Sequence, residues 1–248
     1  MKVTVITATT GNPLLAGCLR SVRQQTYGNI NHLVVGDGPE HWNKIDHMFY
    51  ENRFPNGKNE FYLQLPYPIG KDRWNAHRIY PAATYMAEGD FVMYLDEDNT
   101  LEPTHIEDCI KTIQKGNDWA FSFRKIVDKE GNYLCNDDCE SLGKWPSILD
   151  QNDYFVDVNC YFLPRQLAIN ITPVWYRKFR EPGQMEVDRA LCYFLRKIAP
   201  KYDSTYKYTV NYTVGNTVNS VQAGFFEQGN RIMLQAYDNK LPWKQYES

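Results

Sequence analysis

The sequence predicts a single α/β domain in which a mixed, mostly parallel central sheet is flanked by helices. Strand-length apolar segments alternate with amphipathic helical segments along the first part of the chain, which is the pattern of βαβ units. A length of 248 residues fits one large α/β domain. Acidic residues directly follow two of the expected strands, and open α/β sheets bind their ligands at that edge.

The first elements follow one another in a regular order. Residues 3–8 are β-branched and apolar, as in a buried parallel strand. Pro13 then starts a helix whose apolar residues share one face. The next expected elements are strands at 32–35, 61–65 and 91–95 and a helix at 72–87 with a break at Pro81. Parallel strands joined by helices imply right-handed crossovers.

Beyond residue 103 the alternation is less regular, and the remaining elements are inferred from local patterns. We expect helices at 103–115, 186–198 and 220–238, strands at 118–127 and 153–162, and an extended segment at 206–213. Residues 129–132 have the composition of a hairpin turn. The sequence contains no repeat or low-complexity linker that would separate a second domain.

Composition and charge exclude several classes of protein. Hydrophobic residues make up 43% and charged residues 23%, which excludes a disordered or coiled-coil chain. A net charge of −3 without a long Lys/Arg run argues against a nucleic-acid partner. No apolar stretch approaches the roughly 20 residues that span a bilayer, and no signal segment follows Met1, so we expect a soluble, cytoplasmic protein. The six scattered cysteines are expected to be free thiols.

Two groups of carboxylates are expected at one edge of the sheet. Asp37 follows the strand at 32–35, while Asp96 and Asp98 follow the strand at 91–95. Asp96 and Asp98 are two residues apart and can therefore face the same side of an extended chain. A divalent cation such as Mg²⁺ or Mn²⁺ would relieve their repulsion and bind phosphate oxygens. The alternative is a solvated turn after the strand.

Four segments resemble, in order and spacing, the nucleotide-sugar-binding half of family 2 glycosyltransferases of the GT-A fold. These segments are residues 3–12, 19–27, 34–38 and 87–99. The resemblance covers residues 1–105 well and the rest of the chain weakly. It implies that residues 1–105 form the half that binds the nucleotide-sugar donor, and that residues 106–248 form the acceptor-binding and catalytic half of the same domain.

The resemblance also implies roles for the matching residues. The residues that would bind the nucleotide sugar are Thr7, Ala8, Thr9, Asp37, Asp96 and Glu97. The first three would border the nucleobase and ribose, and Asp37 would hydrogen-bond the base or the ribose. Asp98 would hold a Mn²⁺ or Mg²⁺ ion that bridges the diphosphate.

Residues 183–189 resemble the segment in which this family carries its catalytic carboxylate. Asp188 is the candidate base, with Glu186 as the second choice; the alternative is that Asp188 only interacts favourably with a helix N-terminus. Lys71 and Arg78 are candidates to balance the diphosphate charge, although such residues are commonly ordinary surface side chains.

Asp157 and Asn159 alternate on the expected strand at 153–162 and would therefore share one of its faces. They are low-ranking candidates for contact with the donor sugar or the acceptor. A solvated strand face is the alternative.

The chain departs from the family pattern in several places. Gly36 replaces the first of two paired aspartates, and residues 75–81 replace the usual Arg-Asn-x-Gly. No histidine follows His105, so water or another C-terminal residue would complete the metal shell. Ile232 stands where processive synthases carry tryptophan, and processive synthesis is therefore not expected.

We therefore expect a metal-dependent glycosyltransferase that moves a sugar from a nucleotide-diphosphate donor to the hydroxyl of a glycan or another acceptor. The resemblance implies inversion at the anomeric carbon and non-processive transfer. A catalytically silent nucleotide- or sugar-binding module on the same fold is the alternative, because fold does not fix function. The sugar, the nucleotide, the acceptor and the oligomeric state stay open at this point.

Overall fold

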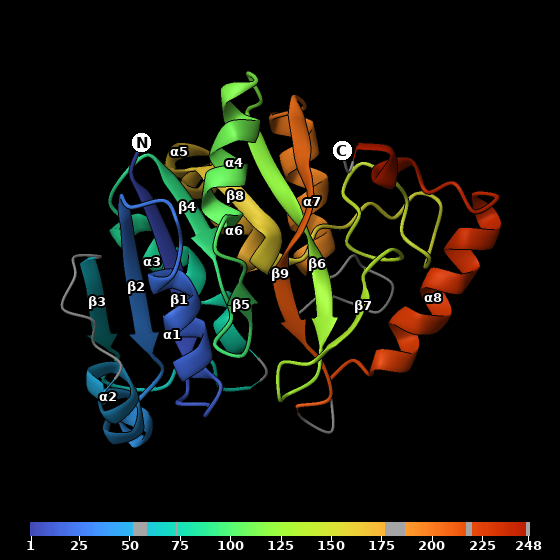
Figure 1. The fold of residues 1–248 in the computed structure, drawn as a ribbon. Coiled ribbons are helices and arrows are strands. Elements are labelled where there is room, and N and C mark those ends of the chain that lie inside the picture. The colour runs from blue at the N-terminus through green and yellow to red at the C-terminus, as the bar shows by residue number, and fades with distance from the viewer. Residues whose placement is uncertain (52–58, 73, 177–186, 217–219, 247–248) are drawn as a thin grey trace.

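A mixed sheet with helices on both faces forms the framework of the protein (Figure 1). The computed structural model describes residues 1–51, 59–72, 74–176, 187–216 and 220–246. Within these ranges the strand order is β3-β2-β1-β4-β8-β6-β9-β5, and β7 pairs with β6. The strands are β1 (Val3–Thr9), β2 (Ile30–Gly36), β3 (Asn59–Gln64), β4 (Phe91–Tyr94), β5 (Thr100–Leu101), β6 (Trp119–Val127), β7 (Tyr133–Asn136), β8 (Tyr161–Pro164) and β9 (Tyr202–Thr213).

Helices cover both faces of this sheet, with α1 and α4 in front of it and α3 and α7 behind it in Figure 1. The helices are α1 (Leu15–Arg23), α2 (Trp42–Glu51), α3 (Ile79–Met86), α4 (His105–Gln114), α5 (Arg165–Asn170), α6 (Thr172–Trp175), α7 (Val187–Ile198) and α8 (Ala223–Ala236). The predicted α/β fold is therefore confirmed.

The N-terminal strands pair in parallel and end at a common edge. β1 pairs with β2 and β4, and β2 pairs with β3, all in the parallel direction. Thr9 lies opposite Gly36, and Ile6 lies opposite Tyr94. Asp37 and Asp96 therefore leave the sheet at the same edge, as the sequence predicts.

Strand β8 joins the two halves of the sheet. It runs antiparallel to β4, where Val92 pairs with Leu163, and antiparallel to β6, where Ala120 pairs with Phe162. The ring of Phe162 also stacks on Phe91 of β4, with centroids 4.8 Å apart. Because β8 runs opposite to β4, the residues just before β8 lie beside the residues just after β4.

The strand expected at residues 153–162 is wrong, and only its end joins the sheet. Asp157 precedes a short 3₁₀ helix at Val158–Cys160, and its side chain accepts a hydrogen bond from the backbone N–H of Asn159. This local capping competes with strand pairing, so β8 begins only at Tyr161. Asp157 and Asn159 therefore do not share a strand face.

The helix expected at 72–87 is shorter than predicted. A 3₁₀ turn at Asn75–His77 comes first, and α3 begins at Ile79, so Pro81 lies in the first turn, where its missing N–H does no harm. Helices α2, α5 and α6 were not predicted. In α2 the buried residues Ile45 and Phe49 are four apart, a spacing that could have indicated this helix.

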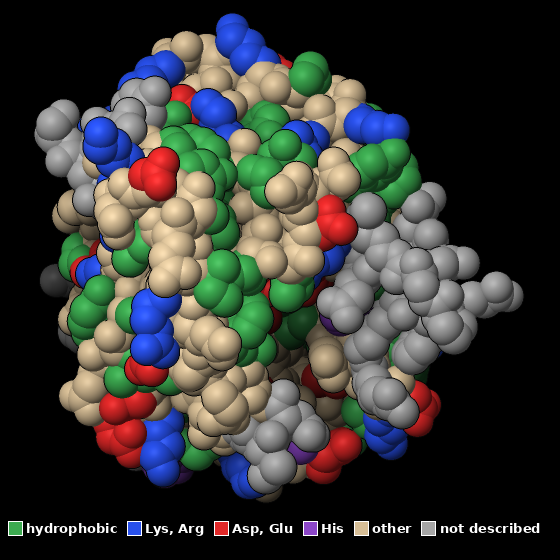
Figure 2. Space-filling model, turned by 90° about the vertical axis from the view of Figure 1, so that its right-hand side faces the viewer, with side chains coloured by type: hydrophobic (Ala, Val, Ile, Leu, Met, Phe, Trp, Pro, Cys, Tyr) green, Lys and Arg blue, Asp and Glu red, His purple; other side chains and the backbone are tan. Residues whose placement is uncertain are grey.

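The helices and the surface charge concern the expectations of no membrane span and no nucleic-acid partner. None of the helices in the described ranges is long and apolar enough to cross a membrane. On the face shown in Figure 2, Lys and Arg side chains are dispersed among acidic and neutral groups. The cytoplasmic location stays a prediction.

Candidate functional site

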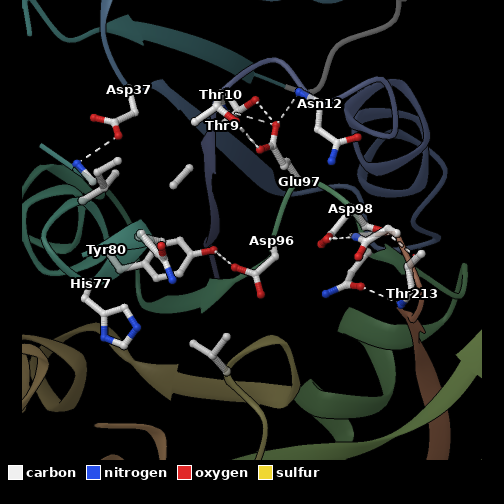
Figure 3. A pocket seen from close by; sticks show the side chains of 18 of the residues that line it. Thr9, Thr10, Asn12, Asp37, His77, Tyr80, Asp96, Glu97, Asp98 and Thr213 are labelled. Atoms are coloured by element: carbon white, nitrogen blue, oxygen red, sulfur yellow. Dashed lines mark hydrogen bonds between the residues drawn. The ribbon is translucent and has the colours of Figure 1, made fainter. Parts of the chain in front are cut away.

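A cavity of about 640 Å³ lies at the carboxyl ends of β1, β2 and β4. Its wall is formed by the loops after these strands, the segment leading into α3, the end of α6, the start of α7 and the segment after β9. Residues from both halves of the chain therefore border one space (Figure 3). Such a crevice is the usual ligand site of an open α/β sheet.

Asp96 is held by donors on both of its carboxylate oxygens. The Tyr80 hydroxyl donates to Oδ1 at 2.5 Å, and the side-chain amide of Asn159 donates to Oδ2 at 2.9 Å. The backbone N–H of Asp96 donates in turn to Asn159 Oδ1 at 2.6 Å. Burial, followed by the nearby Asp98 carboxylate, raises the pKa of Asp96 to about 7. This side chain is therefore fixed in orientation.

Asp98 lies beside the segment that follows β9. The Asn216 amide donates to Asp98 Oδ2 at 2.5 Å, and the Thr213 hydroxyl donates to the Asp98 carbonyl at 2.5 Å. Burial raises the pKa of Asp98, while the hydrogen bond from Asn216 opposes the rise. Asn216, from the C-terminal part of the chain, is therefore a direct hydrogen-bond partner of Asp98, and whether a C-terminal residue completes a metal shell stays a prediction.

Glu97 turns the other way and holds the loop after β1 (Figure 3). Its carboxylate accepts hydrogen bonds from the Thr9 hydroxyl at 2.5 Å, from Thr10, and from the backbone N–H of Asn12 at 2.9 Å. Residues 96–99 form a turn after β4, closed by a hydrogen bond from the Asn99 N–H to the Asp96 carbonyl at 3.1 Å, and within this turn Glu97 faces the loop after β1. Its carboxylate therefore shapes the cavity wall through this loop.

Asp37 holds a second loop at the cavity. Its carboxylate accepts from the backbone N–H groups of Ile69 at 2.7 Å and Gly70 at 2.9 Å. A Cβ atom at Gly70 would come within 2.5 Å of Asp37 Oδ2 and 2.7 Å of the Asn75 carbonyl. Glycine is therefore required for this close approach.

The charge of the cavity wall is strongly one-sided. Among the described residues that line it, the charged side chains are Asp37, Asp96, Glu97, Asp98 and Asp188, and none is Lys or Arg. No group of three or more His, Cys, Asp or Glu side chains in the described ranges is arranged to hold a metal ion. The Asp98 carboxylate nevertheless suits a hard divalent cation, which commonly uses one or two carboxylates together with water and phosphate oxygens.

Most of the residues expected to bind the donor reach the cavity. Ala8, Thr9, Asp37, Asp96, Glu97 and Asp98 line it, and so does the candidate base Asp188 at the start of α7. Asn159 lies directly behind Asp96, and Asp157 lies behind Asn159. Glu186 lies outside the described residues.

Three residues expected to contact the donor do not line this cavity. Thr7 points into the core, where its hydroxyl lies 3.0 Å from His32 Nε2. Lys71 is exposed and does not line the cavity. Arg78 places its guanidinium over the Trp74 ring, 4.0 Å from the centroid, and donates to the Ile69 carbonyl at 3.4 Å.

Sequence reasoning missed several residues that form the cavity. Tyr80 and Asn216 both line it and bond the acidic turn directly. Tyr80 falls in the segment that departs from the family pattern. The Gly215-Asn216 pair after β9 is a turn pattern that could have marked Asn216.

Solved structures of TarS from S. aureus share this fold. The TarS 1–349 structure in complex with UDP has a TM-score of 0.62 and 17% sequence identity, and the match covers 97% of this chain and 72% of that chain. For TarS 1–349 in complex with UDP-GlcNAc the TM-score is 0.62 at 17% identity, covering 100% and 69%. A longer TarS chain matches with a TM-score of 0.61 at 16% identity, covering 100% and 45%.

In sequence, no protein-family model and no curated protein matches the chain. At identities of 16–17% the structural likeness concerns the fold. The framework that carries the acidic cavity is therefore the GT-A-type fold found in glycosyltransferases.

Proposed function

We propose that this protein is a glycosyltransferase that transfers a sugar from a nucleoside-diphosphate sugar to an acceptor hydroxyl with the help of a divalent cation. The observation that carries the proposal is the cavity wall, which presents carboxylates without Lys or Arg among its described residues. A diphosphate would be repelled by such a wall unless a cation lay between them. The TarS structures that share this fold are complexes with UDP and UDP-GlcNAc, which supports a uridine-diphosphate sugar as the donor.

The cation would be Mn²⁺ or Mg²⁺, held by Asp98 with Asn216 beside it. When bound, such a cation stabilises the negative charge that develops on a diphosphate leaving group. Asp98 would contribute one carboxylate, and phosphate oxygens and water would fill the other positions around the cation. Asp96, fixed by Tyr80 and Asn159, would bind the ribose side of the donor.

The nucleobase would lie between the loop after β1 and the loop held by Asp37. Ala8 and Thr9 form one side of this end of the cavity, and Gly70 lies at the other. The Asp37 oxygens already accept two backbone N–H groups, so its contribution is first to hold the loop and then to accept from the base or ribose. Glu97 acts through the loop that it bonds.

Asp188 would serve as the general base at the other end of the cavity. As the acceptor oxygen attacks the anomeric carbon, its proton passes to the Asp188 carboxylate, and the bond between the anomeric carbon and the diphosphate oxygen breaks with its electron pair on phosphate. Attack from the face opposite the leaving group inverts the anomeric carbon. The acceptor, a glycan or another hydroxyl compound, would bind to residues of the C-terminal half.

The first test measures binding. Thermal unfolding is followed with UDP, GDP, dTDP and CDP, each with Mn²⁺, Mg²⁺ or a chelator. A nucleotide at 100 times its Kd should stabilise the protein by about 2.7 kcal/mol, and we expect this for UDP with Mn²⁺. Asp98→Asn should abolish the effect, whereas Asp203→Asn, which removes a carboxylate paired with Lys144 outside the cavity, should not. No stabilisation by any nucleotide would refute the donor site.

The second test separates a transferase from a silent binding module. UDP release from UDP-GlcNAc is measured with Mn²⁺ and with water as the acceptor. A transferase should release UDP slowly, and Asp188→Asn should slow the release by about 10²- to 10⁴-fold without weakening UDP binding. Tight binding without any release, unchanged in Asp188→Asn, would indicate the silent module instead.

A further inference from the structure

Arg124 on β6 lies at the centre of a buried ionic cluster behind the cavity. Its side chain is 1% exposed, and its three nitrogen atoms contact three carboxylates. Nε donates to Asp137 at 2.8 Å, Nη2 donates to Glu140 at 2.7 Å and Nη1 donates to Asp157 at 2.5 Å. The guanidinium also lies 4.2 Å from the centroid of Tyr212, which lines the cavity.

The first branch of this cluster ends at Asp96. Asp157 accepts from Arg124 through Oδ2 and from the side-chain amide of Asn159 through Oδ1, the latter at 2.8 Å. The same Asn159 amide donates to Asp96 Oδ2, and Asn159 Oδ1 accepts from the Asp96 backbone. Asn159 is fully buried, so these partners leave it little freedom to rotate. Arg124 therefore fixes the Asp96 carboxylate through two intermediate side chains.

The second branch ends at the start of α7. Glu140 accepts from Arg124 through Oε2 and from Arg189 through Oε1, the latter at 3.1 Å. Arg189 also donates to Asp153 at 3.0 Å and follows the candidate base Asp188 directly in the chain. This branch therefore holds the helix turn that carries Asp188.

The third carboxylate anchors the cluster to the backbone. Asp137 accepts from the backbone N–H groups of Cys139 at 3.1 Å, Glu140 at 2.8 Å and Ser141 at 3.0 Å. Asp137 thus connects the Arg124 guanidinium to the backbone of this loop. Removing Arg124 from water and surrounding it with carboxylates contributes little net stability, because buried ion pairs often stabilise no more than apolar residues of equal volume. A role in geometry explains the arrangement better than a role in stability.

We propose that Arg124 is a positioning residue that sets the Asp96 carboxylate, on the donor side, relative to the Asp188 carboxylate, on the acceptor side. The inference rests on the proposed function. It assigns a role to residues that contact neither the donor nor the acceptor. Its two branches predict separable effects. The branch through Asn159 acts on donor binding, and the branch through Glu140 acts on turnover.

The test uses variants of the branches, because loss of Arg124 itself would leave three carboxylates buried without their cation. Asn159→Ala should raise the Kd for UDP with Mn²⁺ about tenfold, in the range found when a partner of a ligand-binding side chain is removed. Glu140→Gln keeps the shape of the side chain and weakens its pairing with Arg189, so kcat for UDP release from UDP-GlcNAc should fall about tenfold at unchanged Kd for UDP. Kd is measured by calorimetry and kcat by steady-state kinetics.

Glu60→Gln provides the matched control. Glu60 pairs with Arg23, and the two side chains are 10% and 5% exposed, so this is another buried Arg–Glu pair outside the cavity. It should lower the unfolding temperature and leave Kd and kcat unchanged.

The outcomes separate the two proposals. If Asn159→Ala binds UDP with wild-type Kd while the wild type binds UDP normally, the positioning role is overturned and the proposed function stands. If Asn159→Ala and Glu140→Gln, like Glu60→Gln, change only the unfolding temperature, the cluster is structural. If the wild type itself binds no nucleotide, the proposed function fails, and with it the role of Arg124.

Discussion

In residues 1–105, acidic side chains reach the cavity from the ends of parallel strands, whereas in residues 106–248 the contributing side chains come from a helix start, a 3₁₀ turn and a segment after β9. The first arrangement follows from local pattern, since each parallel strand ends at the same edge. The second depends on which distant segments pack together, as when Asn159 meets Asp96 across 63 positions of sequence. The carboxylates expected to bind the donor therefore come from the first region, with Asn159 and Asn216 of the second region as their hydrogen-bond partners, while turnover should depend on Asp188 in the second region.

The largest effect that would sharpen this comparison is expected for Asp188→Asn. A general base typically contributes 10²- to 10⁴-fold, so kcat for UDP release should fall by about that factor. The Kd for UDP should stay within twofold of wild type, because the substitution is isosteric and lies on the acceptor side. Kinetics and calorimetry on the same preparation measure both values. A change in Kd of the same size as the change in kcat would show that the two regions do not divide the work in this way.

The next effect concerns whether the two regions unfold together. Phe162 on β8 is fully buried and stacks on Phe91 of β4, so Phe162→Ala should cost about 3–5 kcal/mol of unfolding free energy. Phe61→Ala on the edge strand β3, where the ring is 50% exposed, should cost less than about 1 kcal/mol. Urea unfolding followed by fluorescence and by circular dichroism should give one shared transition. Two separate transitions would mean that β8 does not couple the halves.

The sequence predicted the acidic edge of the sheet because its determinants are local. Asp37, Asp96 and Asp98 each follow a strand whose apolar pattern is clear. The direction of Glu97 is set by the turn at residues 96–99, whose residue types favour turns. The partners of these carboxylates could not be predicted. Tyr80 and Asn216 reach them through the packing of distant segments, which leaves no periodic pattern in the sequence.

The strand expected at 153–162 shows the same limit at the level of secondary structure. Its residues alternate as a strand would, but Asp157 caps a turn and pairs with Arg124 from β6, a contact 33 positions away. The contact with a distant cation stabilises a conformation that the local pattern does not indicate. From the sequence, Asp157 and Asn159 are expected near the cavity because they would share a strand face. In the structure they lie there because a capped 3₁₀ turn brings Asn159 to Asp96 and Asp157 to Asn159.

A pH effect of intermediate size is expected from two buried histidines. Burial lowers the pKa of His105 to about 4 and that of His32 to about 3. In the unfolded chain both rings titrate near 6.5, so the unfolded state binds more protons below that pH and stability falls as the pH drops from about 6.5. Each ring should remove about 2 kcal/mol of unfolding free energy between pH 7 and pH 5.

Urea unfolding at several pH values measures this dependence. His105→Gln removes one titrating ring and should flatten the slope. His105 packs on the second region through Thr209 at 2.8 Å, and His32 lies in β2 of the first. Equal slopes in His105→Gln and wild type would show that this ring is protonated in the folded protein at pH 5.

The smallest effect tests whether Glu97 belongs to the donor site directly or through the loop after β1. Glu97→Gln keeps the length of the side chain but replaces one acceptor oxygen by an amide, which weakens the bonds to the Thr9 hydroxyl and the Asn12 N–H. Losing about 1 kcal/mol of loop stabilisation should raise the Kd for UDP about fivefold. The kcat for UDP release should stay unchanged, because the loop lies in the first region.

Glu102→Gln, which weakens an ion pair with Lys125 outside the cavity, is the matched control. Its Kd and kcat should equal those of the wild type. If Glu97→Gln abolishes UDP binding, as Asp98→Asn is expected to do, Glu97 contacts the donor or its cation directly. If the Kd is unchanged, the loop keeps its position without the carboxylate. If the Kd for UDP rises about fivefold while kcat stays constant, Glu97 supports the nucleotide end of the cavity through the loop after β1.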